Sequence, residues 1–150
     1  MIVPPSLYFA KALPGIGNGF ALPMGMTDKR ALVCEDDPAI RSLVRTIVAR
    51  EGFMVDTAAD GSEALEQLRD HCYELILLDL MMPNVDGYSV VDAVRHYSPS
   101  TLKRIVIMTA ASEALQQEFP VPVCSLLPKP FDIDRLSTVV QECARACDSE

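Results

Sequence analysis

The sequence contains no tryptophan, only two histidines, and aromatic residues at just 6% of its 150 positions. It has no C-x-x-C motif, so the Cys and His spacing of a structural zinc site is missing. The longest run without a charge, residues 12–27, is too short and too broken by Gly and Pro to cross a membrane. A zinc-finger protein and a membrane-spanning protein are therefore both disfavoured.

Basic residues are outnumbered by acidic ones. Thirteen Lys and Arg stand against 21 Asp and Glu, which gives a net charge of −8. Because this balance repels nucleic acid and anionic membranes, we expect no direct nucleic-acid partner and no membrane partner, but rather cations or basic partners. Apolar residues at 49% and charged residues at 23% are typical of a globular protein, and 150 residues suit one domain.

The five cysteines form an odd and scattered set: Cys34, Cys72, Cys124, Cys143 and Cys147. An odd number without metal-site spacing favours a reducing compartment, and so a cytoplasmic protein. Cys143 and Cys147 lie four residues apart on an expected helix and could bind a metal, but small buried thiols are the commoner explanation. We therefore expect thiols rather than a metal site at this helix.

Proline and glycine are concentrated at the N-terminus. They make up eight of the first 25 residues but only ten of the remaining 125, a density close to that of low-complexity sequence. We expect residues 1–28 to be a flexible or artefactual arm and residues 29–150 to be the folded domain. Met26 is an alternative start. Whether the first 25 residues are native, and whether the chain is full length or a fragment, stays open.

Short apolar runs alternate with helical patterns from residue 29 onward. The predicted strands are Ala31–Cys34, Phe53–Thr57, Leu75–Leu78, Ile105–Met108 and Val123–Leu127. Strands that alternate with helices are typical of βα units and a parallel sheet. The sequence therefore predicts an α/β fold.

The helices between these strands have clear ends. Asp37 is the expected N-cap of the first, Pro38 occupies its first position and Gly52 stops it. Its predicted apolar face consists of Ile40, Leu43, Val44, Ile47 and Val48. The last helix starts after Asp132 or Asp134, and its apolar or small residues are Leu136, Val139, Val140, Cys143, Ala144 and Cys147. The middle helices are expected at Ser62–His71, Gly87–Tyr97 and, in a short form, Ser112–Phe119.

Four of the predicted strands are followed by side chains that can bind a ligand or take part in a reaction. The first runs into Glu35 and Asp36, the third into Asp79, the fourth into Thr109 and the fifth into Lys129. Ligands of an open parallel sheet gather beyond the carboxyl ends of its strands. If the first and third strands are neighbours, the three carboxylates converge on a volume of negative charge suited to Mg²⁺.

A metal ion, a carboxylate and an ammonium group are the groups that phosphoryl transfer commonly requires. Asp79 would attack the phosphorus in line, and Thr109 and Lys129 would hold the product oxygens. Each acidic residue taken alone has a simpler explanation, since acidic residues often cap helices, and we assign Asp37 to that role. For the whole set, a chance arrangement is a poor explanation.

Four segments together resemble the receiver domain of two-component response regulators. They cover about residues 29–148 in the same order and spacing, and they read LVCEDDP (32–38), LLDLMMPNVDG (77–87), MTA (108–110) and PKPF (128–131). The resemblance implies a doubly wound, five-stranded parallel sheet in the flavodoxin-like order 2-1-3-4-5, with five helices of which the fourth is short.

The resemblance also implies a phosphorelay function. Asp79 would accept a phosphoryl group from a histidine kinase, a phosphotransfer protein or a small donor such as acetyl phosphate. Asp36 would bind Mg²⁺ directly and Glu35 through water, together with Asp79 and the backbone carbonyl of Met81. A downstream protein target or an output domain outside this chain would read the signal.

The expected switch region consists of Thr109, Ala110, Leu126 and Pro130. Thr109 would move toward the phosphoryl group and Lys129 would pair with it, while the bond between Lys129 and Pro130 would be cis. Leu126 departs from the family pattern, because many receivers have Tyr or Phe there. The segment between Thr109 and Lys129 is also about two residues shorter than in the family. We therefore expect the output surface, but not the phosphorylation site, to depart from the family pattern.

Two residues that flank the site in the family, Met81 and Ala111, have no side chain able to orient an attacking water. We therefore expect the phosphoryl group to persist. The charge that it adds would bias the Thr109–Ser112 loop and the short fourth helix.

Three functions compete. The first is the phosphorylatable receiver, which turns over no substrate beyond its own phosphorylation and is not an enzyme in the usual sense. The second is a pseudo-receiver, an interaction module independent of phosphorylation, which Leu126 keeps open. The third is a phosphohydrolase of the haloacid-dehalogenase type, whose D-x-D motif after the first strand is not reproduced by residues 35–37.

Overall fold

The computed structural model describes residues 29–110 and 121–148. In chain order the elements are β1 (Arg30–Cys34), α2 (Pro38–Arg50), β2 (Met54–Ala58), α3 (Gly61–Asp70), β3 (Leu75–Asp79), α4 (Gly87–Tyr97), the 3₁₀ helix η1 (Pro99–Arg104), β4 (Ile105–Thr109), β5 (Ser125–Pro128) and α6 (Ile133–Asp148). The predicted alternation of strands and helices is confirmed. The predicted arm over residues 1–28 and the short helix at Ser112–Phe119 lie outside the described residues.

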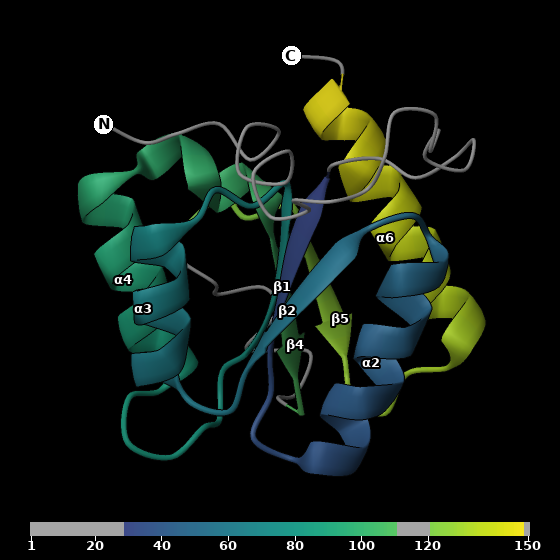
Figure 1. Ribbon diagram of the computed structural model, residues 1–150, viewed down its shortest axis with the longest axis horizontal. Helices are drawn as coiled ribbons and strands as arrows, with labels where there is room; N and C mark the ends of the chain where they lie inside the picture. The colour runs from purple at the N-terminus through teal and green to yellow at the C-terminus, as the bar shows by residue number, and fades with distance from the viewer. Residues whose placement is uncertain (1–28, 111–120, 149–150) are drawn as a thin grey trace, which may run out of the picture.

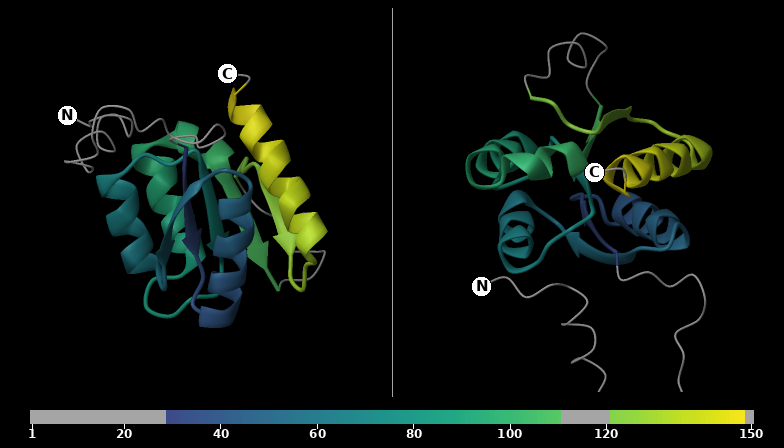
Figure 2. Two further views of the ribbon diagram at one scale, coloured as in Figure 1. Left: turned by 45° about the vertical axis from the view of Figure 1, so that its right-hand side comes forward. Right: turned by 90° about the horizontal axis from the view of Figure 1, so that it is seen from above.

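The five strands form one parallel sheet in the order β2-β1-β3-β4-β5. Helices α2 and α6 cover one face and α3 and α4 the other, so that the sheet lies between two helical layers (Figures 1 and 2). This is the doubly wound order that the resemblance implied. Among the described residues, no helix is both long and apolar enough to cross a membrane.

The central strands are buried on both faces. Every residue of β3 and β4 is buried, which explains why these strands are continuous apolar runs rather than alternating patterns. Alternate residues of each strand pack toward opposite layers, for example Leu77 toward α2 and α6 and Leu78 toward α3 and α4. The two apolar layers hold the strand ends, and therefore the polar side chains beyond them, in a rigid frame.

An aspartate lies directly before each of four helices. The side chain of Asp37 accepts hydrogen bonds from the backbone N–H groups of residues 39 and 40 and caps α2, as predicted. Asp60 caps α3 and Asp86 caps α4 in the same way. Asp132 precedes α6 and accepts from the N–H of Arg135, so the last helix starts after the first of the two aspartates considered.

One residue of the predicted apolar face of α2 is misplaced. Leu43 is 45% exposed, whereas Val44, Ile47 and Val48 are buried. With 3.6 residues per turn, Leu43 lies at the margin of the arc that these three residues turn toward the sheet. The spacing of apolar residues therefore predicted the correct buried face of α2 but included one residue, Leu43, that is exposed.

The expectation of unpaired thiols is wrong for two of the cysteines. Cys124, just before β5, forms a disulfide with Cys143 of α6, and their Cα atoms are 6.1 Å apart. Nothing in a separation of 19 residues marks this pair; the packing of α6 beside β5 brings the two together. Cys34 and Cys72 are free thiols, and the side chain of Cys147 lies outside the described part of the chain.

Gly87, the first residue of α4, lies against the backbone at the end of β3. A Cβ atom placed there would lie 2.6 Å from the Cα of Leu80 and would also overlap the carbonyl oxygen of Asp79. The Gly87 N–H donates to the Leu80 carbonyl at 3.0 Å. Glycine is therefore required here for steric reasons, because α4 starts directly on the backbone that carries Asp79.

We predict that Gly87→Ala lowers the free energy of unfolding by about 1–3 kcal/mol, because the added methyl group must displace backbone rather than a flexible side chain. Urea denaturation measures the change. Ser89→Ala is the matched control, since Ser89 is an exposed side chain two residues further along the same helix, and it should change stability by less than about 0.5 kcal/mol. Equal stability of the two variants would contradict the steric argument.

Candidate functional site

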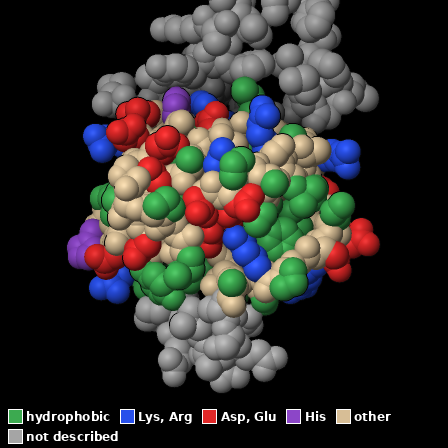
Figure 3. Space-filling model, turned by 90° about the horizontal axis from the view of Figure 1, so that it is seen from below, with side chains coloured by type: hydrophobic (Ala, Val, Ile, Leu, Met, Phe, Trp, Pro, Cys, Tyr) green, Lys and Arg blue, Asp and Glu red, His purple; other side chains and the backbone are tan. Residues whose placement is uncertain are grey.

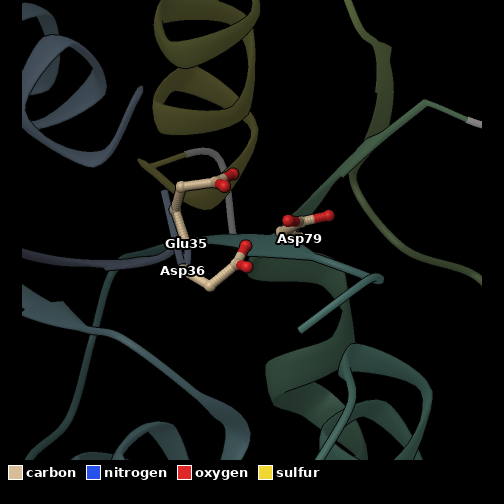
Figure 4. A group of neighbouring side chains, drawn as sticks. All are labelled: Glu35, Asp36 and Asp79. Carbon is tan, nitrogen blue, oxygen red and sulfur yellow. The ribbon is translucent and has the colours of Figure 1, made fainter. Parts of the chain in front are cut away.

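The carboxylates predicted to converge do meet at the carboxyl edge of the sheet. Strands β1 and β3 are neighbours, with Cys34 opposite Leu78, so the residues that follow them lie side by side. One carboxylate oxygen from each of Glu35, Asp36 and Asp79 lies within 4.8 Å of the others. The three side chains point toward one another (Figure 4).

Two of these carboxylates are buried. Glu35 is 1% and Asp79 3% exposed, whereas Asp36 is exposed. Seen from the edge where the strands end, acidic side chains gather near the middle of the face, with basic ones beside them (Figure 3). A buried carboxylate is costly unless a charge partner or a metal compensates it.

Lys129, which directly follows the edge strand β5, supplies a positive charge at the same edge of the sheet. Its Nζ donates to Glu35 Oε2 at 2.6 Å and to Asp79 Oδ2 at 3.3 Å. Its backbone N–H donates to the Thr109 carbonyl at 2.7 Å. The peptide bond between Lys129 and Pro130 is cis, as the resemblance implied.

Burial and charge act on the titration of this pair in opposite directions. Burial raises the pKa of Glu35 above its ordinary value, while the hydrogen bond from Lys129 works to lower it. For Lys129, burial disfavours the charged form, but the contacts with Glu35 and Asp79 outweigh it and raise the pKa. Lys129 is therefore an ammonium group at neutral pH.

Backbone amides fix the orientation of the two buried carboxylates. Asp79 Oδ1 accepts from the Met81 N–H at 3.0 Å, and Glu35 Oε1 accepts from the Asp37 N–H at 3.2 Å. Each carboxylate thus has one oxygen held by the backbone and the other facing Lys129. The side chain of Met81 is 70% exposed beside the site.

The remaining residues of the predicted site lie near this edge as well. Thr109 is buried at the end of β4, paired with Pro128 of β5. Ala110 is exposed, and Leu126 is partly buried and packs on the layer of α3 and α4. Ala111 lies outside the described residues.

Arg41 is a residue of this site that sequence reasoning missed. Its guanidinium donates to the backbone carbonyl of Glu35 at 2.9 Å and to that of Asp36 at 3.3 Å. It therefore ties the first turn of α2 to the acidic loop. Its position four residues after the N-cap Asp37 was the available signal, but an arginine in that place is usually surface.

The charges of the cluster show whether a metal would fit. Counted by formal charge, the three carboxylates and the ammonium of Lys129 leave a net charge of −2 within a small, partly buried volume. A divalent cation would neutralise this excess, and hard oxygen ligands of this kind favour Mg²⁺. The residues present therefore suit Mg²⁺ next to the Asp79 carboxylate.

Comparison with known proteins agrees with this geometry. Residues 31–141 match the family model described as response regulator receiver domain. The chain is 34% identical over 109 residues to the transcriptional regulatory protein DltR of Streptococcus agalactiae, covering 71% of this chain and 48% of that protein. The chain thus spans about half the length of this transcriptional regulator.

Two further proteins are similar over nearly their whole length. Sporulation initiation phosphotransferase F of Bacillus subtilis is 29% identical over 119 residues, which cover 78% of this chain and 94% of that protein. The crystal structure of response regulator protein TrrA from Thermotoga maritima in complex with Mg(2+)-BeF has a TM-score of 0.68 and 31% identity, covering 77% of this chain and 98% of that one.

We predict that Asp36→Asn weakens Mg²⁺ binding about tenfold or more, because it removes one negative charge from the cluster. Isothermal titration calorimetry with Mg²⁺ measures the affinity. Asp37→Asn is the matched control: it removes the adjacent exposed carboxylate but keeps a residue that caps α2 equally well. Loss of affinity in the control but not in Asp36→Asn would place the metal elsewhere.

Proposed function

The chain belongs to the family of response regulator receiver domains, and from this premise we propose that Asp79 accepts a phosphoryl group in a phosphorelay. The donor is a histidine kinase or phosphotransfer protein, or a small acyl phosphate. The observation that carries the proposal is the convergence of three carboxylate oxygens within 4.8 Å at the edge where Lys129 also contacts Asp79. Acidic residues that merely lie on the surface or cap helices would not need to bring three carboxylates and an ammonium group together at one edge of the sheet.

Asp79 is the nucleophile of the proposed reaction. A bond forms between one of its carboxylate oxygens and phosphorus, and the bond from phosphorus to the donor nitrogen or oxygen breaks. The Met81 N–H bond to Oδ1 restricts rotation of the carboxylate before the reaction. Mg²⁺ bound by Glu35, Asp36, Asp79 and the Met81 carbonyl would supply positive charge to the phosphoryl oxygens.

Lys129 changes partners in this proposal. Its ammonium divides its contacts between Glu35 and Asp79, and a new phosphoryl group would add acceptor oxygens and negative charge beside it. Thr109 follows β4 next to the strand of Asp79, from where its hydroxyl would donate to a phosphoryl oxygen. The two residues would thereby couple phosphorylation to β4 and β5.

We place the switch in the residues that follow these strands, namely Thr109, Ala110, Leu126 and Pro130. The loop beyond Ala110 and the helix expected at Ser112–Phe119 are its proposed moving parts, and they lie outside the described residues. Leu126 is partly buried against the layer of α3 and α4. As an aliphatic side chain it offers no ring to rotate, so the output signal would rest on the loop itself.

The proposed partners follow from the chemistry. Receiver domains are regulators rather than true enzymes, and we propose that this one signals by contact with a downstream protein or with an output domain outside this chain. The acidic charge of −8 agrees with contact to proteins rather than nucleic acid. We expect it to act in the cytoplasm, as receiver domains typically do, and residues 29–150 to suffice for phosphorylation.

Incubation with acetyl phosphate and Mg²⁺ should add the mass of one phosphoryl group to the intact chain, as measured by mass spectrometry. Asp79→Asn should abolish the adduct, whereas Asp92→Asn, which alters an exposed carboxylate on α4, should keep it. A folded wild-type protein without any adduct would instead identify a pseudo-receiver. Steady release of phosphate would identify a phosphohydrolase.

The adduct should persist for minutes or longer in the presence of Mg²⁺, because the thioether of Met81 is too weak a hydrogen-bond acceptor to orient an attacking water. Met81→Gln, which places an amide at this exposed position, should shorten the lifetime. Met82→Gln is unsuitable as a control because Met82 is buried, so Tyr88→Gln at another exposed position is the comparison. A wild-type half-life of seconds would refute this expectation.

A further inference from the structure

The disulfide between Cys124 and Cys143 anchors the segment that delivers Lys129 to the site. Cys124 enters β5, and its N–H donates to the Ile105 carbonyl at 2.8 Å. Cys143 is 2% exposed on the face of α6 that packs against the sheet. Helix α6 lies beside β5 in two views (Figures 1 and 2), and the cross-link joins them covalently.

The chain between the two cysteines forms a ring that contains a functional side chain. It includes β5, Lys129 and helix α6 as far as Cys143. Within this ring, Lys129 makes its two ionic contacts with Glu35 and Asp79. The ring is held to the sheet through Cys124 and to the helical layer through Cys143, so its closure restricts the backbone that carries the ammonium group.

We propose that Cys124 and Cys143 form a reversible redox site that regulates phosphoryl acceptance at Asp79. The proposal rests on the proposed function, because its output is the phosphorylation of that residue. In the oxidised protein the closed ring keeps Lys129 beside Asp79. In the reduced protein two thiols in van der Waals contact replace the covalent link, and the Lys129 segment gains freedom.

The redox step is a thiol–disulfide exchange. A dithiol reductant attacks one sulfur as a thiolate, the bond between Cys124 and Cys143 breaks, and a second attack within the reductant releases both cysteines as thiols. The reductant becomes a disulfide, having given up two electrons and two protons. A small disulfide oxidant reverses the step. Cys124 is partly buried whereas Cys143 is 2% exposed, so the reductant attacks more readily at Cys124.

The coupling works in both directions. If the closed ring favours phosphoryl acceptance, a phosphoryl group that pairs with Lys129 also favours the closed ring. We expect the oxidised protein to accept a phosphoryl group about fivefold faster than the reduced protein under the same concentration of donor, because the reduced protein must first order the segment that carries Lys129. Asp79, Glu35 and Asp36 themselves are unchanged by the redox state.

Peptide mapping tests the cross-link itself. Trypsin cuts after Arg104, Arg135 and Arg145 but not between Lys129 and Pro130. Cys124 therefore falls in peptide 105–135, Cys143 in peptide 136–145 and Cys147 in a third peptide. Digestion of protein treated with oxidised glutathione and then alkylated should give the first two peptides joined. Dithiothreitol should separate them. Two results would overturn the proposal. One is the absence of this joined pair. The other is a link between peptide 136–145 and the peptide that contains Cys147.

Phosphorylation kinetics test the regulation. Oxidised and reduced wild-type protein are incubated with acetyl phosphate and Mg²⁺, and the phosphoryl adduct is followed over time by mass spectrometry. Cys124→Ser should behave as the reduced protein in both conditions. Cys72→Ser, which alters a partly buried free thiol outside the ring, should keep the redox difference.

The outcomes separate this inference from the proposed function. Equal rates in oxidised and reduced wild-type protein, with adduct formed in both, would overturn the redox control and leave Asp79 as phosphoacceptor. No adduct in either state would overturn the proposed function and this inference with it. Circular dichroism of Cys124→Ser checks its fold, and the comparison of the two wild-type forms stands without that variant.

Discussion

The burial of negative charge at one edge of the sheet is the constraint on which the site depends. Glu35 and Asp79 are almost wholly enclosed, and a carboxylate in that position is stable only with compensating partners. Lys129, which follows β5, contacts one oxygen of each carboxylate. Backbone N–H groups of Asp37 and Met81 hold the other two oxygens. The cluster still has an excess of negative charge, and this excess is what makes it suitable for a divalent cation and for phosphoryl chemistry.

The apolar layers make this arrangement possible. Because β3 and β4 are buried on both faces, they cannot shift to relieve repulsion at their ends. Gly87 lets α4 begin directly on the backbone of Asp79, and the N-cap Asp37 starts α2 next to the acidic pair. The same packing that stabilises the domain therefore holds like charges close together. A charged group added to Asp79 would change the balance at several strand ends at once.

Much of this could be predicted from the sequence, and the misses have physical causes. The strands were recognisable because strands buried on both faces are continuous runs of Val, Ile and Leu. The helix starts were recognisable because Asp caps a helix and Pro fits its first position. Leu43 was misplaced because helical spacing defines a stripe but not its width. Arg41 was missed because an arginine on a helix has many uses, and its bonds to two carbonyl groups depend on the path of the acidic loop.

The sequence by itself determined the alternation of elements, the helix caps and the identity of the polar residues at the strand ends, since these follow from local periodicity and side-chain chemistry. The neighbouring strand ends followed from the sequence only through its resemblance to a known family. Only the tertiary structure decided that Lys129 contacts both Glu35 and Asp79, and that Cys124 pairs with Cys143. Such pairings depend on the order of strands in the sheet and on the placement of α6. No short-range pattern encodes them, because the partners lie between 19 and 94 residues apart.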